Sequence, residues 1–552
     1  MLVKLQNFFA RVPLWICALA IFAVALGARI HWIGEKRGFH LDEAFSVQLA
    51  LYNPHYPWED DAKARGGVSR TFSCGELKKA CYSCDPGVPA ALDTIRKLRE
   101  DNRDSPHTNF YYSLLRAAWI GNDGETSVDS LKRRGCALNL LFFAGTFVAM
   151  FALLKRLFGA ENKGVICAGL AAASLCTGAI SNTLFMRPYA LQEPFFVLFT
   201  LGFLMLWDKI RAGEPIVSIR NFLLCATLTA LTLLTAYFAV VYVILLFAVL
   251  AFFALRGNEK KSVAFLGAIF AGALALAIAA YPNYPDGFFG YRGQEAAGKF
   301  ALDTLGQNLS ESMRAVSASL CDALYYVPLL ALLAVFVVWS RLSGAPESGG
   351  KASRPQLQAP LIVAVALAWA SACMFLAPYK TMRYVMPMFP ILSLLVPWIV
   401  ARCAVRKRAL LSAGTVAVFG VCAFTAKGTD DGVASQQGAF APPFSQVEQI
   451  FPEKTRPFVE NLSDSKHAVV MISEKYPLGP HDPLLSMPDH VKLVYVSDPK
   501  ELERTIEREQ AEIVMIQNDS APLPESENRR IQKVKWCWFF DVYRIDRAAE
   551  EL

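Results

Sequence analysis

The chain is constrained most by its repeated blocks of apolar residues, few of which contain a charge. About 20 apolar residues in an α-helix are needed to cross the hydrocarbon core of a bilayer, and the blocks have that length. The chain has 552 residues and is only 19% charged, whereas soluble proteins average about 25%. The pattern predicts a polytopic α-helical membrane protein.

We expect about eleven transmembrane helices from these blocks. The expected spans are 13–33, 136–157, 164–184, 190–207, 221–236, 238–255, 262–281, 323–340, 360–377, 384–401 and 409–426. With the N-terminus inside, Lys and Arg occur in every short inner connection, as the positive-inside rule requires. No small-residue cleavage site follows the first span, which indicates a retained signal-anchor. An odd number of spans places the C-terminal region outside.

The composition divides the chain into two expected domains. A membrane domain over 1–426 includes a first extracytoplasmic loop at 34–134, and a soluble extracytoplasmic domain covers 427–552. In the second domain, short buried strands are expected at 468–472, 491–496 and 512–516, with a last strand at 536–545. A helix at 499–510 lies between two of them, and this order predicts a small α/β domain.

Asp42 and Glu43 are adjacent carboxylates just after the first span. Apolar neighbours predict a short amphipathic helix at the bilayer surface. A carboxylate there is suited to act as a general base or to hold a divalent cation, which is the one cofactor that the sequence suggests. The alternative is an acidic pair that stabilises the first turn of a helix.

Cationic and aromatic residues gather at three outer span ends, and arginine and lysine there are suited to bind a phosphate. They are Arg187, Tyr189, Arg292, Lys380, Arg383 and Tyr384. His107 closes the first outer loop and could contact the same phosphate. The alternative is an ordinary aromatic belt with snorkelling cations, and a surface histidine beside a helix start. Glu193, near the outer end of a span, either lines a cavity or lies at the interface.

Three cysteines lie in the first outer loop, where a disulfide is the default state outside the cytoplasm. We expect one local disulfide among Cys74, Cys81 and Cys84, with the third thiol free or paired with Cys537.

Four short segments together resemble the GT-C superfamily of polyprenyl-phosphate-dependent glycosyltransferases. More closely, they resemble its bacterial branch related to protein O-mannosyltransferases and the lipid A aminoarabinose transferase. The resemblance covers about the first ten of the expected spans. The four segments are His40-Leu41-Asp42-Glu43-Ala44, His107-Thr108-Asn109-Phe110-Tyr111-Tyr112, Arg187-Pro188-Tyr189-Ala190-Leu191 and Arg383-Tyr384-Val385-Met386-Pro387-Met388-Phe389-Pro390. Thr108 and Asn109 replace prolines that are usual in the second segment.

The resemblance implies a GT-C-like fold and an inverting transfer of a sugar from a polyprenyl-phosphate donor to an acceptor. Asp42 would be the general base, and Glu43 would orient the acceptor or help hold a metal. Arg187, Lys380 and Arg383 would bind the leaving phosphate, with hydrogen bonds from Tyr189, Tyr384 and His107.

The expected partners are the lipid-linked donor, membrane lipids and a glycan, lipid or protein acceptor, without nucleic acid, because no basic run is interleaved with aromatics. The expected location is a bacterial inner membrane with the active site on the extracytoplasmic side. A transporter or flippase of lipid-linked sugars is the first alternative, and a structural or sensory membrane protein is the second.

Overall fold

The structure is a computed structural model that describes residues 12–36, 39, 41–53, 57–101, 104, 107–122, 126–324, 334, 338, 357–402, 405–425, 468–472, 489–511, 513–517, 529–537 and 540–547. Its internal contacts divide the chain into two compact units. Unit 1 comprises Met1–Gly34, Arg99–Tyr111 and Cys136–Pro442. Unit 2 comprises Glu35–Leu98, Tyr112–Gly135 and Pro443–Leu552.

Six helices among the described residues are long and apolar enough to cross a membrane. They are α2 (Leu14–Glu35), α8 (Val128–Phe158), α11 (Tyr189–Ala212), α13 (Ala239–Arg256), α14 (Lys260–Ala280) and α19 (Gln358–Leu376). A seventh span results if α9 (Lys163–Leu175) and α10 (Thr177–Leu184), which meet at a 47° bend, count as one crossing. The protein is therefore an integral membrane protein. The expected count of eleven stays a prediction, since the expected span at 323–340 lies almost wholly outside the described residues.

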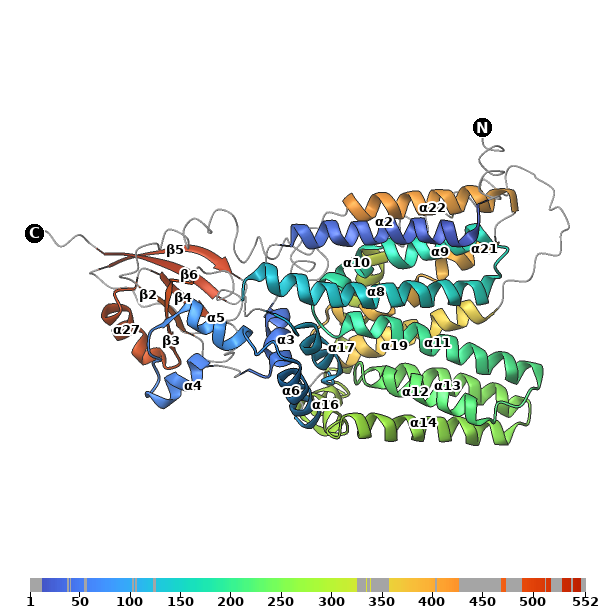
Figure 1. Cartoon of the computed structure of the whole chain (residues 1–552), viewed down its shortest axis with the longest axis horizontal. Coiled ribbons are helices and arrows are strands. Elements are labelled where there is room, and N and C mark those ends of the chain that lie inside the picture. The colour runs from blue at the N-terminus through green and yellow to red at the C-terminus, as the bar shows by residue number, and fades with distance from the viewer. Residues whose placement is uncertain are drawn as a thin grey trace, which may run out of the picture. The chain divides into compact units, whose positions relative to one another are not determined.

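Shorter helices complete unit 1 (Figure 1). In this unit α12 (Ile219–Leu233) packs against α11 and α14, while α9 packs against α22 (Val405–Thr425) and α21 (Leu395–Arg402). Close approach to α9 depends on Gly169, where an added Cβ would lie 2.7 Å from the Leu154 side chain and 3.0 Å from that of Pro397. Small residues permit such close helix packing within a membrane.

The expected span at 384–401 stays a prediction, because Met386–Arg402 is apolar but shorter than a full crossing and is divided into short pieces. These are η1 (Met382–Tyr384), η2 (Met386–Met388), α20 (Phe389–Leu392) and α21. Pro387, Pro390 and Pro397 explain the interruptions, since proline lacks the amide that a continuous helix needs. The first piece carries Arg383 and Tyr384 in a single 3₁₀ turn.

Unit 2 is built on a six-stranded sheet of order β1-β3-β2-β4-β6-β5. The strands are β1 (Phe72–Ser73), β2 (Ala468–Ile472), β3 (Lys492–Val496), β4 (Ile513–Gln517), β5 (Arg529–Cys537) and β6 (Phe540–Arg547). β2 is parallel to both of its neighbours, and the other pairs are antiparallel. Helix α27 (Leu502–Arg508) connects β3 to β4 and buries Leu502 and Ile506 in the core that they form.

The expected α/β character of the C-terminal region is confirmed, with one correction. The expected last strand at 536–545 is two antiparallel strands, β5 and β6, whose pairing begins at Arg529↔Arg547. The expected domain boundary at 427 lies outside the described residues and stays a prediction.

The first loop supplies the helices α3 (Leu41–Leu51), α4 (Pro57–Ala64), α5 (Cys74–Tyr82), α6 (Val88–Glu100) and α7 (Phe110–Ala118). Helix α3 coincides with the amphipathic helix expected at Asp42 and Glu43. The loop also supplies the edge strand β1 to the sheet of unit 2. That contribution was not expected, because a two-residue strand leaves no alternating pattern in the sequence.

Candidate functional site

In unit 1, His107 and Arg187 converge on the carboxylate of Asp104. The Asp104 Oδ2 atom lies 3.2 Å from His107 Nδ1 and 3.3 Å from Arg187 Nη2. Arg187 Nη2 lies 3.5 Å from His107 Nδ1. All three side chains are buried, with residue exposures of 3–4%. Two basic side chains therefore share one carboxylate oxygen in a site from which water is largely excluded, where charges interact strongly.

The turn between α10 and α11 positions Arg187, and its backbone is fixed from the neighbouring helix. Asn139 of α8 donates through Nδ2 to the carbonyls of Thr183 and Phe185, each at 3.0 Å. The Tyr111 hydroxyl donates to Asn139 Oδ1 at 3.1 Å. The Arg187 amide in turn donates to the Phe185 carbonyl at 2.7 Å. These bonds define the turn that presents Arg187.

Aromatic rings connect this cluster to the segment that follows α19. The His107 ring meets Tyr189 edge-on at 5.3 Å between centroids, and Tyr189 meets Tyr384 at 6.3 Å with perpendicular planes. The Arg383 guanidinium lies 5.3 Å from the centroid of Tyr384. The structure thus brings together five of the residues singled out in the sequence, from three separate segments. Edge-on aromatic pairs and cation–π contacts stabilise such an arrangement.

Lys380 has a different environment. Its Nζ donates to the carbonyls of Met374, Phe375 and Ala377 at 2.8, 2.9 and 3.4 Å, at the C-terminal end of α19. Burial lowers the pKa of Lys380, and the charge of Lys299 lowers it further. In the structure Lys380 therefore caps α19, as a cation at a helix C-terminus does, and its role at the phosphate stays a prediction.

Arg292 cannot be placed in this site. It belongs to α16 (Tyr291–Gly298), but its side chain lies outside the described part of the chain.

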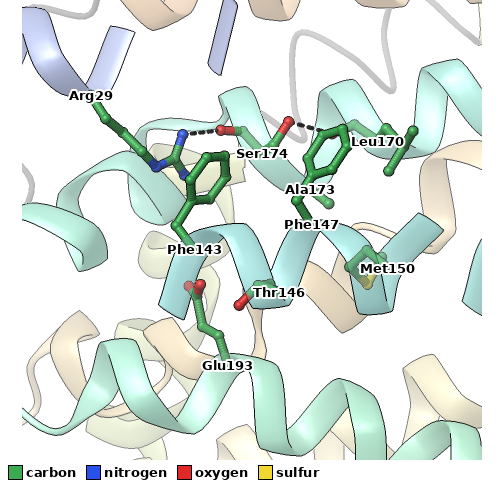
Figure 2. Close-up of a pocket in the computed structure, with 9 residues that line it drawn as sticks. All are labelled: Arg29, Phe143, Thr146, Phe147, Met150, Leu170, Ala173, Ser174 and Glu193. Carbon is green, nitrogen blue, oxygen red and sulfur yellow. Dashed lines mark hydrogen bonds between the residues drawn. The ribbon is translucent and has the colours of Figure 1, made fainter. Parts of the chain in front are cut away.

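A second buried polar group lies deeper in unit 1, beside a pocket with room for about one water molecule (Figure 2). Arg29 of α2 donates to the Ser174 carbonyl at 2.7 Å and to Thr183 Oγ1 at 2.9 Å. Its guanidinium carbon lies 3.6 Å from the Phe143 centroid. Glu193 points from α11 toward the same pocket and accepts a 2.8 Å hydrogen bond from Asn182 Nδ2.

The Arg29 contact explains how the bend between α9 and α10 is tolerated. The last carbonyls of α9 have no partner within the helix, because the chain leaves helical geometry at Cys176. Arg29 supplies a donor to one of these carbonyls and holds α10 through Thr183. Since α10 leads directly into the Arg187 turn, Arg29 and Glu193 support the site rather than form it.

In unit 2, Asp42 and Glu43 lie in the first turn of α3 and have different surroundings. Glu43 is 2% exposed and forms an ion pair with Lys36, which is 3% exposed. Asp42 is only partly buried, and its carbonyl accepts a 2.8 Å hydrogen bond from the Ser46 hydroxyl. The Lys36 carbonyl accepts from Lys132 Nζ at 2.7 Å, which fixes the backbone beside the pair. Glu43 is thus neutralised within the protein, and Asp42 is the more accessible carboxylate.

Among the described residues, Cys74, Cys81 and Cys84 form no disulfide, contrary to expectation. Cys74 and Cys81 are the first and eighth residues of α5. At 1.5 Å rise per residue their Cα atoms are about 10 Å apart, beyond the roughly 7 Å limit of a disulfide. Burial raises the pKa of both thiols to about 12. The side chain of Cys537 lies outside the described residues.

Within the described ranges, no group of three or more His, Cys, Asp or Glu side chains is arranged to hold a metal ion. The divalent metal suggested by the acidic pair stays a prediction.

Three of the residues described here were not anticipated as partners of the site. Asp104 is a single acid in a polar loop, which carries no recognisable pattern. Lys36 lies at the end of the first span, where a lysine is ordinary. Arg29 did carry a signal, because an ionisable residue within an apolar span is costly and needs partners.

No protein-family model matches the chain, and no curated protein matches it. The solved structures that are similar over almost its full length include two of ArnT from Cupriavidus metallidurans. The crystal structure of ArnT from Cupriavidus metallidurans in the apo state shares 13% identity and a TM-score of 0.46, with 96% of this chain and 97% of that chain covered. The structure of the same protein bound to undecaprenyl phosphate shares 12% identity and a TM-score of 0.47, with 97% and 98% covered.

Proposed function

We infer that the protein is a membrane glycosyltransferase that moves a sugar from a polyprenyl-phosphate donor to an acceptor at the extracytoplasmic face, with inversion at the sugar. The observation that carries this inference is the buried cluster of His107 and Arg187 on Asp104, extended by Tyr189, Tyr384 and Arg383. It combines cationic and hydrogen-bonding groups at the ends of apolar spans. A phosphate whose lipid chain lies in the bilayer requires such groups at that level.

Arg187 is the primary phosphate ligand in this proposal. Its guanidinium carries a planar set of five N–H donors, which suits two phosphate oxygens at once. His107 and Tyr189 add hydrogen bonds, and Arg383 adds positive charge. Preorganised donors of this kind stabilise the negative charge that develops on a leaving phosphate.

Asp42 is the general base. It removes the proton from a hydroxyl or amine of the acceptor while that nucleophile attacks the anomeric carbon. The bond between this carbon and the phosphate oxygen breaks, and polyprenyl phosphate leaves with the electron pair. Attack opposite to the leaving group inverts the configuration. Glu43 holds the backbone of Asp42 through its ion pair with Lys36 and takes no proton.

Turnover is tested with the purified protein in lipid nanodiscs and a panel of polyprenyl-phosphate sugars, by measuring release of polyprenyl phosphate. Asp42→Asn is expected to lower kcat by about 10²- to 10⁴-fold, the usual contribution of a general base. The matched control is Asp60→Asn, an exposed carboxylate in the same unit, which should leave kcat unchanged. Undiminished turnover by Asp42→Asn would exclude Asp42 as the base.

A transporter of lipid-linked sugars would require a different arrangement of helices. Secondary transporters typically carry interrupted helices in corresponding positions of two repeats. Among the described residues one span, α9 with α10, is sharply bent in this way. Protein-dependent movement of the lipid across vesicles without release of polyprenyl phosphate from any donor would favour the transporter and overturn the proposal.

A further inference from the structure

The first loop and the C-terminal sheet are joined within unit 2, and we propose that the sheet positions the Asp42 helix through α5 and Asn53. The C-terminal region would then support the general base, whatever else it binds. The part of this inference that concerns catalysis rests on the proposed function of Asp42.

The first link is the pairing of β1 with β3. Phe72 lies opposite Leu493 and Ser73 opposite Lys492 in an antiparallel register. Backbone hydrogen bonds extend the pairing on both sides. The Ser69 amide donates to the Tyr495 carbonyl at 2.9 Å, and the Cys74 amide donates to the Val491 carbonyl at 2.8 Å. The loop therefore completes an edge of the sheet, which would otherwise expose unpaired backbone groups.

The second link is the start of α5, which follows β1 without a break. Ser73 is both a strand residue and the N-cap of α5, where it forms a capping box with Glu76. The Gly75 amide donates to the Asp489 carbonyl at 2.9 Å, and a Cβ at Gly75 would lie 3.1 Å from that of Asp489. The orientation of α5 is thus set directly by the backbone that precedes β3.

An ion pair fixes the same contact. Lys78 Nζ lies 2.9 Å from Asp489 Oδ1, and the Lys78 side chain is 10% exposed. The Asp489 side chain is 74% exposed, so the pair lies at the protein surface and contributes modestly to stability. Lys78 and Gly75 are three residues apart on α5, so the helix is held to the Asp489 segment at two adjacent turns.

The third link joins the other end of α5 to α3. Asn53, just beyond α3, donates through Nδ2 to the carbonyls of Cys81 and Ser83, both at 2.9 Å. These carbonyls belong to the end of α5, where backbone acceptors lack helical partners. The preceding residue, Tyr52, has φ = 57°, a conformation that bulky residues rarely adopt. The chain therefore leaves α3 in a strained turn that the Asn53 contacts hold in place.

Together these links form a continuous route from β3 through β1 and α5 to Asn53 and α3. Asp42 lies at the opposite end of α3, an 11-residue helix. A change in the orientation of this helix therefore moves Asp42. Asn53 is thus a positioning residue, since it acts on Asp42 through the helix. Lys78 and Asp489 are positioning residues one step further away.

Hydrogen exchange of the full-length protein in nanodiscs tests the route independently of catalysis. Lys78→Glu places two carboxylates together at Asp489, and amides of 41–53 should exchange roughly fivefold faster, because a packing contact of α3 has been weakened. Lys78→Glu combined with Asp489→Lys restores the opposite charges and should return exchange close to that of the wild type. Lys79→Glu is the matched control, since Lys79 is the exposed neighbour on the same helix.

Asn53→Asp is nearly isosteric, but its side chain cannot donate hydrogen bonds to the Cys81 and Ser83 carbonyls. It should therefore accelerate amide exchange in 41–53. It should also lower kcat about tenfold, with little change in the acceptor KM. Faster exchange confined to 72–82 and 489–496 in Lys78→Glu, with 41–53 unchanged, would overturn the inference. If the wild type shows no glycosyl transfer, the proposed function fails, while the exchange result still decides whether the sheet supports α3.

Discussion

Each unit contains a buried set of acidic and basic side chains. Among the described residues, the two sets differ in how many basic groups meet one carboxylate. In unit 2, one ammonium meets one carboxylate, Lys36 with Glu43. In unit 1, Arg187 and His107 both approach the same oxygen of Asp104. Among the described residues, the second set thus places two basic side chains on one carboxylate, and the Arg383 guanidinium lies 5.3 Å from the centroid of Tyr384.

The number of basic groups on one carboxylate distinguishes a structural ion pair from a binding site when both are buried. A matched pair gains nothing from a further anion, because each charge is already compensated. A carboxylate that is shared by two basic groups orients them, and the two groups can still bind a phosphate. On this distinction we propose a structural role for Glu43 and binding of the substrate phosphate by Arg187.

Removing the charge of Glu43 should have the largest effect, and it should be on stability. Glu43→Gln removes the carboxylate that pairs with the buried Lys36 ammonium, and breaking a buried pair in this way costs about 3–5 kcal/mol. The combined change Lys36→Met with Glu43→Leu should recover most of that loss. The measurement is the midpoint of thermal unfolding in nanodiscs, with the exposed Glu507→Gln as control. A folded, stable Glu43→Gln protein without turnover would give Glu43 a chemical role instead.

Arg187→Ala should affect the donor without unfolding the protein. Loss of one donor set at a developing oxyanion lowers kcat/KM by about 10²- to 10³-fold. Arg187→Lys should recover only part of this, because an ammonium cannot bind two oxygens in a fixed plane. The control is Arg211→Ala, an exposed arginine at the other end of α11. Unaltered kcat/KM for the lipid donor in Arg187→Ala would remove Arg187 from the phosphate site.

Asp104→Asn tests whether the shared carboxylate orients the two basic groups. The side chain keeps its size but loses its charge, and a charge-assisted hydrogen bond contributes about 1.5–3 kcal/mol, so kcat should fall roughly tenfold. The control for steady-state kinetics is Asp101→Asn, because Asp101 is an exposed residue three positions earlier in the chain. A full loss of activity equal to that of Asp42→Asn would instead indicate that Asp104 takes part in proton transfer.

Lys380→Met should have the smallest effect. A cation at a helix C-terminus contributes about 0.3–1 kcal/mol, so the unfolding midpoint should fall slightly. Donor KM should change by less than about twofold, since the Lys380 ammonium caps α19. A tenfold rise in donor KM would return Lys380 to the phosphate site that its sequence position suggested.

Much of the fold follows from the distribution of apolar residues along the chain, which reflects the hydrophobic effect. Apolar length identified the long helices, and short apolar runs identified β2, β3 and β4. The prolines at 387, 390 and 397 are visible in the sequence, but their effect depends on packing against neighbouring helices. The strand β1 was not predictable, because its two residues acquire their conformation only by pairing with β3.

The candidate site was predictable in its residue types and less so in its connections. His107, Arg187, Tyr189, Arg383 and Tyr384 were singled out because they stand at span ends, and the structure places them in one series of contacts. The sequence could not show that Lys380 meets helix carbonyls or that Glu43 meets Lys36. Those outcomes depend on which acceptor lies within a few ångströms, and sequence distance does not encode that.

The position of Arg29 also bears on how the protein is assembled during synthesis. Arg29 is made 145 residues before Ser174 and 154 residues before Thr183, to which it donates hydrogen bonds. The first span therefore enters the bilayer while these partners do not yet exist, and a lone arginine in a span is unfavourable there. Its position near the end of α2 lets the side chain reach the headgroups in the meantime. We therefore expect Arg29 to reach its buried position only after α9 and α10 have been inserted, so that α2 docks late in biogenesis.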